Sequence, residues 1–195
     1  MAEIKSTMEM VLERAAKMTA ETVPASDDDN LIKTGMKIAA DFLNKKITDP
    51  HKELLSQAAE TQTSIRKGMA QTLLRNIVLS RDENLQETGA EAIKGILLLA
   101  QNSGEVTTIC QELQQILEQY GQHKEQTTQQ LKDALRSQLE QQQTAAGESQ
   151  QGTINPAMHP QYKEELAKML TSLNNQYNDA MTQRKEVILN RLCHS

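Results

Sequence analysis

The spacing of apolar residues predicts one long, unbroken helix over residues 105–143. This stretch holds no proline and one internal glycine, Gly121. Its apolar residues recur every three or four positions, which is the spacing of one face of an α-helix. They are Ile109, Leu113, Ile116, Leu117, Tyr120, Leu131, Leu135 and Leu139. A second long pattern over residues 162–192 predicts another helix, and together the two predict an antiparallel hairpin.

The first hundred residues predict four shorter helices. Their expected ranges are 3–20, 26–47, 50–79 and 80–100. Ser26 is a suitable N-cap for the second, and Asp49 followed by Pro50 suits the start of the third. Residues 80–83 read as a capping box, in which Ser80 and Glu83 each bond the other's backbone amide. We therefore expect the chain to turn at Ser80.

The predicted fold class is all-α, because few stretches alternate apolar and polar residues as β-strands do. We expect an elongated helical bundle of about six helices with a long antiparallel C-terminal helical hairpin. Residues 1–102 form the N-terminal bundle of four shorter helices, and residues 103–195 form the hairpin. Residues 144–160 hold two of the eight glycines and two of the four prolines, so we expect a mobile loop there.

An eleven-residue repeat runs through both long helices. It links Ile109, Tyr120 and Leu131 in the first, and Leu166, Tyr177 and Ile188, as well as Leu170, Met181 and Leu192, in the second. Eleven residues over three turns give about 3.67 residues per turn, close to a straight helix. The hairpin is therefore expected to be nearly straight rather than a tightly wound coiled coil.

Composition narrows the classes of partner. The net charge is −5, and basic residues alternate with acidic ones instead of forming the stripe of a nucleic-acid-binding surface. No apolar run is long enough to span a membrane. We therefore expect no nucleic acid and no membrane among the partners. Two cysteines are too few for a secreted disulfide framework, which favours a cytoplasmic location.

No pattern in the sequence indicates catalysis. None of the four histidines has another candidate ligand three or four residues away on an apolar face, and Cys110, Cys193 and His194 together leave a zinc site one ligand short. No glycine-rich phosphate loop and no nucleophile elbow has the required spacing. We expect no catalytic residues, no metal and no cofactor, and hence no enzyme.

Two function classes remain. The first is a non-enzymatic scaffold or adaptor that acts through helix–helix contacts, as a homodimer, because a two-helix hairpin offers apolar positions on more than one side. The expected interface residues are Leu113, Leu117, Leu135, Leu139, Leu170 and Leu192. The alternative is a ligand-binding or sensory bundle. Its pocket would be lined by Met36, Phe42, Met69 and Ile96, since methionine adapts to irregular ligands.

Cys110 and Cys193 form a possible redox pair. Their mean position is the middle of the loop at 144–160, so in a hairpin with equal arms they lie at the same height. We expect their Cα atoms within about 10 Å of each other, without a resting disulfide. The other interpretation is two buried packing residues, which is the usual state of a free cysteine.

Residues 3–14, near the N-terminus, read Glu-Ile-Lys-Ser-Thr-Met-Glu-Met-Val-Leu-Glu-Arg. This stretch resembles the start of a family of small, uncharacterised bacterial helical proteins, and the resemblance covers roughly the first twenty residues. It implies an all-helical protein in a bacterial cytoplasm. It implies no activity and no site residues.

Overall fold

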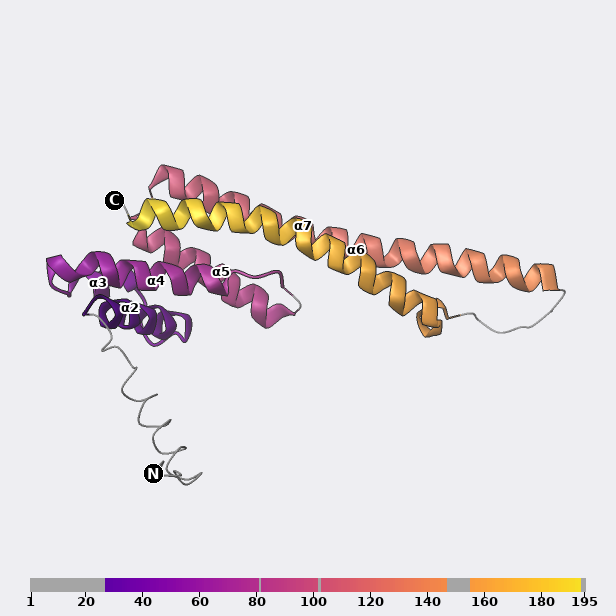
Figure 1. Ribbon diagram of the computed structural model, residues 1–195, viewed down its shortest axis with the longest axis horizontal. Helices are drawn as coiled ribbons and strands as arrows, with labels where there is room; N and C mark the ends of the chain where they lie inside the picture. The colour runs from indigo at the N-terminus through magenta and orange to yellow at the C-terminus, as the bar shows by residue number, and fades with distance from the viewer. Residues whose placement is uncertain (1–26, 81, 102, 147–154, 194–195) are drawn as a thin grey trace, which may run out of the picture.

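The computed structural model describes residues 27–80, 82–101, 103–146 and 155–193. These residues are all-α, with no β-strand among them, which confirms the predicted fold class. The α-helices are α2 (Asp27–Leu43), α3 (Pro50–Leu55), α4 (Gln62–Asn76), α5 (Glu83–Leu99), α6 (Gly104–Ala146) and α7 (Pro160–Cys193) (Figure 1). Two short 3-10 helices, η1 (Ala59–Thr61) and η2 (Pro156–Met158), complete the set. The helix predicted over residues 3–20 lies outside the described residues.

The predicted third helix is two helices, so the single helix over 50–79 is wrong. Asp49 caps α3 as expected, its carboxylate accepting from the amides of His51 and Lys52. However, α3 ends at Leu55, where the Ser56 hydroxyl donates to the carbonyl of Glu53 at 2.7 Å. A serine that bonds nearby backbone competes with helix continuation. The chain then passes through η1 before α4 begins.

The connection between α4 and α5 also differs from the prediction. α4 ends at Asn76, because Ile77 adopts an extended conformation, and residues 77–80 continue without helix. The N-cap of α5 is Asp82, whose carboxylate accepts from the Leu85 amide at 2.9 Å. The predicted capping box from Ser80 to Glu83 is therefore wrong, and the N-cap of α5 lies two residues after Ser80. Aspartate and serine are equally good caps, so residue type alone did not decide between them.

The closest helix pair is α2 against α4. A Cβ atom added at Gly35 would lie 1.9 Å from the carbonyl oxygen of Ile65, and one at Gly68 would lie 2.0 Å from that of Ile32. Both separations are far below van der Waals contact, so only glycine fits at this crossing. The two backbones pack directly against each other, which anchors α2 to the rest of the bundle.

One hydrophobic core joins α2–α5 to the adjoining parts of α6 and α7. Its most enclosed members include Phe42, Met69, Leu73, Ile93 and Ile96. From the hairpin it takes Val106, Cys110 and Leu113 of α6, and Met181, Ile188 and Leu192 of α7. The predicted boundary near residue 102 therefore does not divide the core.

The hairpin extends well beyond this core. α6 has 43 residues, and at 1.5 Å per residue it is about 65 Å long. In α6, the last residue that belongs to the core or packs against it is Leu117, and in α7 the first such residue is Met181. We call residues 121–146 and 156–177 the arm. Figure 1 shows the arm projecting from the bundle, with the end of α6 reaching past the start of α7.

The connection between α6 and α7 is shorter than the predicted loop at 144–160. α6 continues to Ala146, and α7 begins at Pro160. Asn155 caps η2 by accepting from the Ala157 amide at 3.1 Å, and η2 packs on both α6 and α7. The centre of the predicted loop, residues 147–154, lies outside the described residues.

Candidate protein interaction surfaces

Two ion pairs fix the register of α6 against α7. The Nε atom of Arg184 lies 3.1 Å from Oε2 of Glu112, and that of Arg191 lies 3.1 Å from Oε2 of Glu105. Seven residues along α6 correspond to seven residues back along α7, so the helices are antiparallel, as predicted. Exposed pairs of this kind add little stability, but their agreement defines which residues face each other.

A polar and aromatic cluster continues this register at the base of the arm. The Tyr120 hydroxyl donates to Oδ1 of Asn174 at 2.8 Å, and the Tyr177 hydroxyl is hydrogen-bonded to Nδ1 of His123 at 2.6 Å. The two tyrosine rings meet edge to face, 5.5 Å apart. The eleven-residue repeats in the sequence contain both tyrosines, but the two repeats did not indicate that they would meet.

The seam of the hairpin is the line of apolar residues along which α6 meets α7. The arm lacks the additional layer of helices that covers this seam in the bundle. Where α4 and α5 pack over it, the seam is buried, as at Leu113, Ile188 and Leu192. Along the arm, Leu135 is buried, but five other leucines of the same seam are only half-buried. They are Leu131, Leu139, Leu166, Leu170 and Leu173. Two helices alone cannot enclose an apolar stripe as a bundle does.

The six leucines expected at an interface divide into two groups. Leu113, Leu135 and Leu192 are 0%, 5% and 4% exposed, so they pack inside this chain and are not part of an accessible surface. Leu113 and Leu192 belong to the core that the hairpin shares with the shorter helices. Leu117, Leu139 and Leu170 are half-buried, and the last two belong to the arm.

Charges on the arm are mixed in sign. Nζ of Lys168 lies 2.8 Å from Glu164 and 3.2 Å from Glu165, one turn away on the same helix. The contact with Lys168 holds the pKa of Glu164 below its usual value, and the two glutamates raise the pKa of Lys168. Such a surface is compatible with a second copy of itself, since neither sign dominates.

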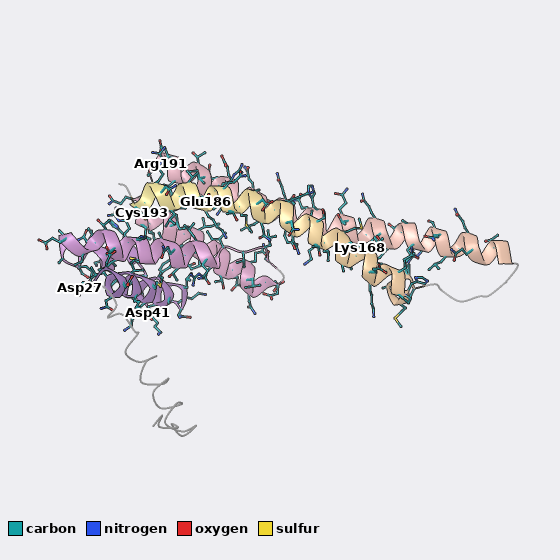
Figure 2. The ribbon with its side chains drawn as sticks, in the orientation of Figure 1. Asp27, Asp41, Lys168, Glu186, Arg191 and Cys193 are labelled. Carbon is teal, nitrogen blue, oxygen red and sulfur yellow. The ribbon has the colours of Figure 1, made fainter. Side chains whose placement is uncertain are left out.

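The register separates the two cysteines. Extending it from Glu112 and Arg184 places Glu186 opposite Cys110, so Cys193 lies about seven residues, or about 10 Å of helix rise, further along α7. The prediction that the two share a height is wrong, because α6 is longer than α7 and the arms are unequal. Figure 2 shows Cys193 at the bundle end of α7.

Both cysteines are free thiols. Burial raises the pKa of the Cys110 thiol to about 11. Burial also raises the pKa of Cys193, although Lys67 and Arg66 act in the opposite direction. Thiolates rather than thiols attack disulfides, and a raised pKa leaves fewer thiolates at neutral pH. Cys110 is buried and Cys193 is half-buried, which favours the alternative of two packing residues.

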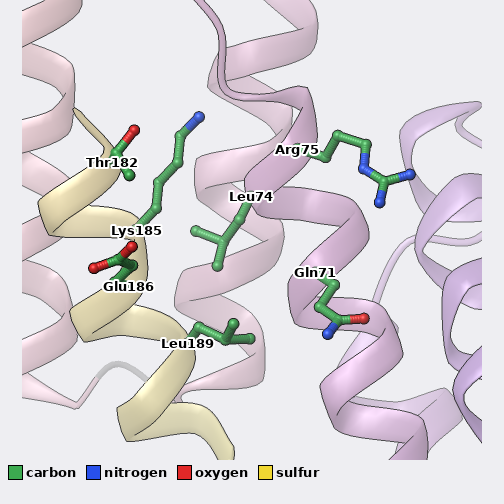
Figure 3. A pocket seen from close by; sticks show the side chains of 7 residues that line it. All are labelled: Gln71, Leu74, Arg75, Thr182, Lys185, Glu186 and Leu189. Carbon is green, nitrogen blue, oxygen red and sulfur yellow. The ribbon is translucent and has the colours of Figure 1, made fainter. Parts of the chain in front are cut away.

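The residues expected to line a methionine-rich pocket belong to the core. Phe42, Met69 and Ile96 are enclosed by other side chains, while Met36 is half-buried. A shallow cavity of about 360 Å³ lies elsewhere, between α4 and α7 (Figure 3). There Leu74 and Leu189 face each other from the two helices, whereas Arg75 points away from α7.

Lys185 closes one end of this cavity and joins the hairpin to α4. Its ammonium group donates to the carbonyl of Ile77, just beyond the end of α4. Carbonyls at a helix end lack partners within the helix, and a cation there is favourable. Burial lowers the pKa of Lys185.

A larger groove of about 540 Å³ lies between α5 and α6, with residues 78–80 at one side. Its apolar lining comes from Val78, Leu85, Ala90, Ile93 and Leu117. Glutamines and the carboxylates of Glu118 and Glu125 form its edge, and Gly121 lies on the α6 side. We call this feature the α5–α6 groove.

The described residues contain no group of three or more His, Cys, Asp and Glu side chains placed to hold a metal ion. Within the same part of the chain, no helix is long and apolar enough to cross a membrane. The arm has half-buried leucines along its seam, and the α5–α6 groove has a partly apolar lining.

Residues 51–190, more than half of the chain, match a sequence family described as "Family of unknown function (DUF6657)". The match covers α3 to α7 almost completely. The N-terminal stretch that resembles bacterial helical proteins lies outside it. Neither the curated proteins nor the solved structures contain a significant match.

Proposed function

Since the chain belongs to this family, whose description names no activity, we propose from its geometry that it is a non-enzymatic helical scaffold or adaptor. It acts through helix–helix contacts and associates with a second copy through the arm. The observation that carries the proposal is the half-burial of five arm leucines on a seam that is buried where the bundle covers it. They are Leu131, Leu139, Leu166, Leu170 and Leu173.

Association of two arms would cover this seam. Two hairpins laid side by side form a four-helix bundle, in which the stripe of each helix is enclosed by the other three. The arm's alternating charges place no large like-charged surface against the second copy. Met169, 38% exposed on α7, would lose water contact in the same step. Each buried apolar side chain contributes in proportion to the area removed from water.

Sedimentation velocity over a wide range of protein concentration tests this function. The full chain is expected to sediment as a dimer, and the double variant Leu139→Gln/Leu170→Gln as a folded monomer with unchanged helical circular dichroism. Leu55→Gln is the matched control, because Leu55 is 58% exposed on α3, away from the arm. A wild-type chain that remains monomeric at the highest concentration would contradict self-association through the arm.

The ligand-binding alternative has less support. Three of the four residues expected to line its pocket are core residues, so a ligand at that place would have to displace them. A cytoplasmic location remains part of the proposal and is supported by the two free thiols. A bacterial source rests on the resemblance of residues 3–14 alone.

A further inference from the structure

α5 and α6 are packed together where they connect and separated further along. Near their connecting turn, Leu99 and Val106 are both buried. Beyond it the α5–α6 groove opens, lined on α5 by residues from Leu85 to Ile93 and on α6 by residues from Gln114 to Glu125. These spans correspond to about 12 Å and 16 Å of helix. The groove thus has the length of two to three helical turns.

The lining of the groove is suited to the apolar face of a helix. Val78, Leu85 and Leu117 are half-buried, so part of each remains in contact with solvent. A third helix laid between two diverging ones would bury these side chains, as in the helix-in-groove mode of recognition. About eight to eleven residues of helix would fit this length.

The edge of the groove is acidic. Glu118 and Glu125 are exposed and seven residues apart, so they lie on one face of α6. The sequence between the lining residues Ser80 and Leu85 reads Arg-Asp-Glu-Asn, with one basic and two acidic side chains. No lysine or arginine is found among the described residues that line it. The field at the edge therefore attracts a cationic partner.

We propose that the α5–α6 groove binds a short, basic amphipathic helix of a partner protein. The proposal rests on the proposed function, because it assigns a second helix–helix contact to the same scaffold. Charge selects this occupant over the chain's own segments. Residues 1–26 hold more acidic than basic residues, and the whole chain carries a net charge of −5, so neither complements an acidic edge.

Gly121 allows the groove to be blocked without disturbing the fold. A Cβ atom added at Gly121 would meet no other atom within 4 Å, and residue 121 lies inside α6. Leucine is also a far better helix former than glycine. Gly121→Leu therefore fills the groove from α6 and leaves the chain folded. Gly121→Ala gives the same gain in helix propensity with little occupation of the groove, which makes it the matched control.

Fluorescence anisotropy tests the proposal with a labelled probe peptide of about eleven residues, the greatest length that the groove accommodates. Its leucines stand at positions i, i+3, i+4 and i+7, and its other residues are lysine. Gly121→Leu is expected to weaken binding by about tenfold or more, as when an interface pocket is lost, and Gly121→Ala to leave it unchanged. Glu118→Lys and Glu125→Lys are expected to weaken it by about threefold each. Glu140→Lys, an equal charge change on the exposed surface of α6, controls for general attraction.

Three results would overturn the proposal. The first is equal weakening by Glu140→Lys with no effect of Gly121→Leu, which would mean non-specific adsorption. The second is equal binding of a peptide in which glutamate replaces every lysine. The third is no binding by the wild-type chain. The arm variant Leu139→Gln/Leu170→Gln is expected to bind the peptide normally. If the wild-type chain forms a dimer but does not bind the peptide, the groove proposal is wrong and association through the arm stands. If the wild-type chain binds the peptide but never forms a dimer, association through the arm is wrong and the groove proposal stands.

Discussion

The backbones of Gly68 and Ile32 are in direct contact, so that a Cβ atom on Gly68 would lie 2.0 Å from the Ile32 carbonyl oxygen. The Gly35 contact with Ile65 on the opposite helix has the same character. Close backbone approach of this kind permits weak Cα–H···O contacts and leaves no room for a side chain. The position of α2, and with it that of Phe42 in the core, depends on this crossing.

Gly68→Ala is therefore expected to lower the free energy of unfolding by about 3 kcal/mol, because overpacking against backbone outweighs the gain in helix propensity. Urea denaturation followed by circular dichroism measures it. Gly121→Ala, also inside a helix but facing open space, should raise the free energy of unfolding by about 1 kcal/mol. Equal effects of the two substitutions would contradict the close crossing.

Lys45 occupies a backbone conformation that favours glycine. Its φ is 59°, and the amides of Lys45 and Lys46 donate to the carbonyls of Phe42 and Asp41, both at 2.9 Å. This is a Schellman ending of α2. Lys45→Gly is expected to stabilise the chain by about 0.5–1 kcal/mol, since glycine adopts this conformation without strain. A fall in the thermal midpoint would contradict this assignment.

The two thiols should differ sharply in reactivity. Cys193 is half-buried, whereas Cys110 is 1% exposed. With a chromogenic disulfide reagent, the native chain is expected to release the equivalent of one thiol quickly and the second only as the chain unfolds. Peptide mapping should assign the fast thiol to Cys193. Rapid modification of both residues in the native chain would contradict the burial of Cys110.

Burial of Cys110 also predicts a dependence of stability on alkaline pH. Its pKa rises on folding from an ordinary value of 9.0 to about 11, so the unfolded chain ionises first. Ionisation of this thiol therefore does not lower the free energy of unfolding below pH 9. It lowers that free energy between pH 9 and pH 11, by up to about 3 kcal/mol. Cys110→Ala should lose this part of the decline. Parallel pH profiles for the two proteins would contradict the prediction.

Helical spacing predicted α6 and α7 to within a few residues, because long periodic stretches leave few alternatives. It did not predict the break after Leu55, since residues 56–58 are compatible with a continuous helix and a serine bonding to nearby backbone, as Ser56 does to Glu53, has no distinct signal in the apolar spacing. The prediction that the two cysteines lie at the same height along the hairpin assumed two helices of equal length. It was wrong because α6 is longer than α7.

The candidate surfaces were predicted less well than the fold. The pattern identified the seam leucines but could not indicate which of them α4, α5 and η2 cover, because those contacts join residues distant in sequence. For the same reason the α5–α6 groove has no sequence signal of its own. Its residues occupy separate faces of two helices, which only their divergence brings together around an open space.

Pulsed dipolar spectroscopy on a spin-labelled arm tests whether two chains associate through it. The label is placed at residue 169 by Met169→Cys, in a chain that also carries Cys110→Ala and Cys193→Ser. A label at residue 55, introduced by Leu55→Cys, is the control for association through the bundle. If the arms associate, the labels at residue 169 of two chains lie at a defined distance, which disappears on dilution with unlabelled protein. A featureless decay at residue 169, or a defined distance at residue 55 alone, would contradict association through the arm.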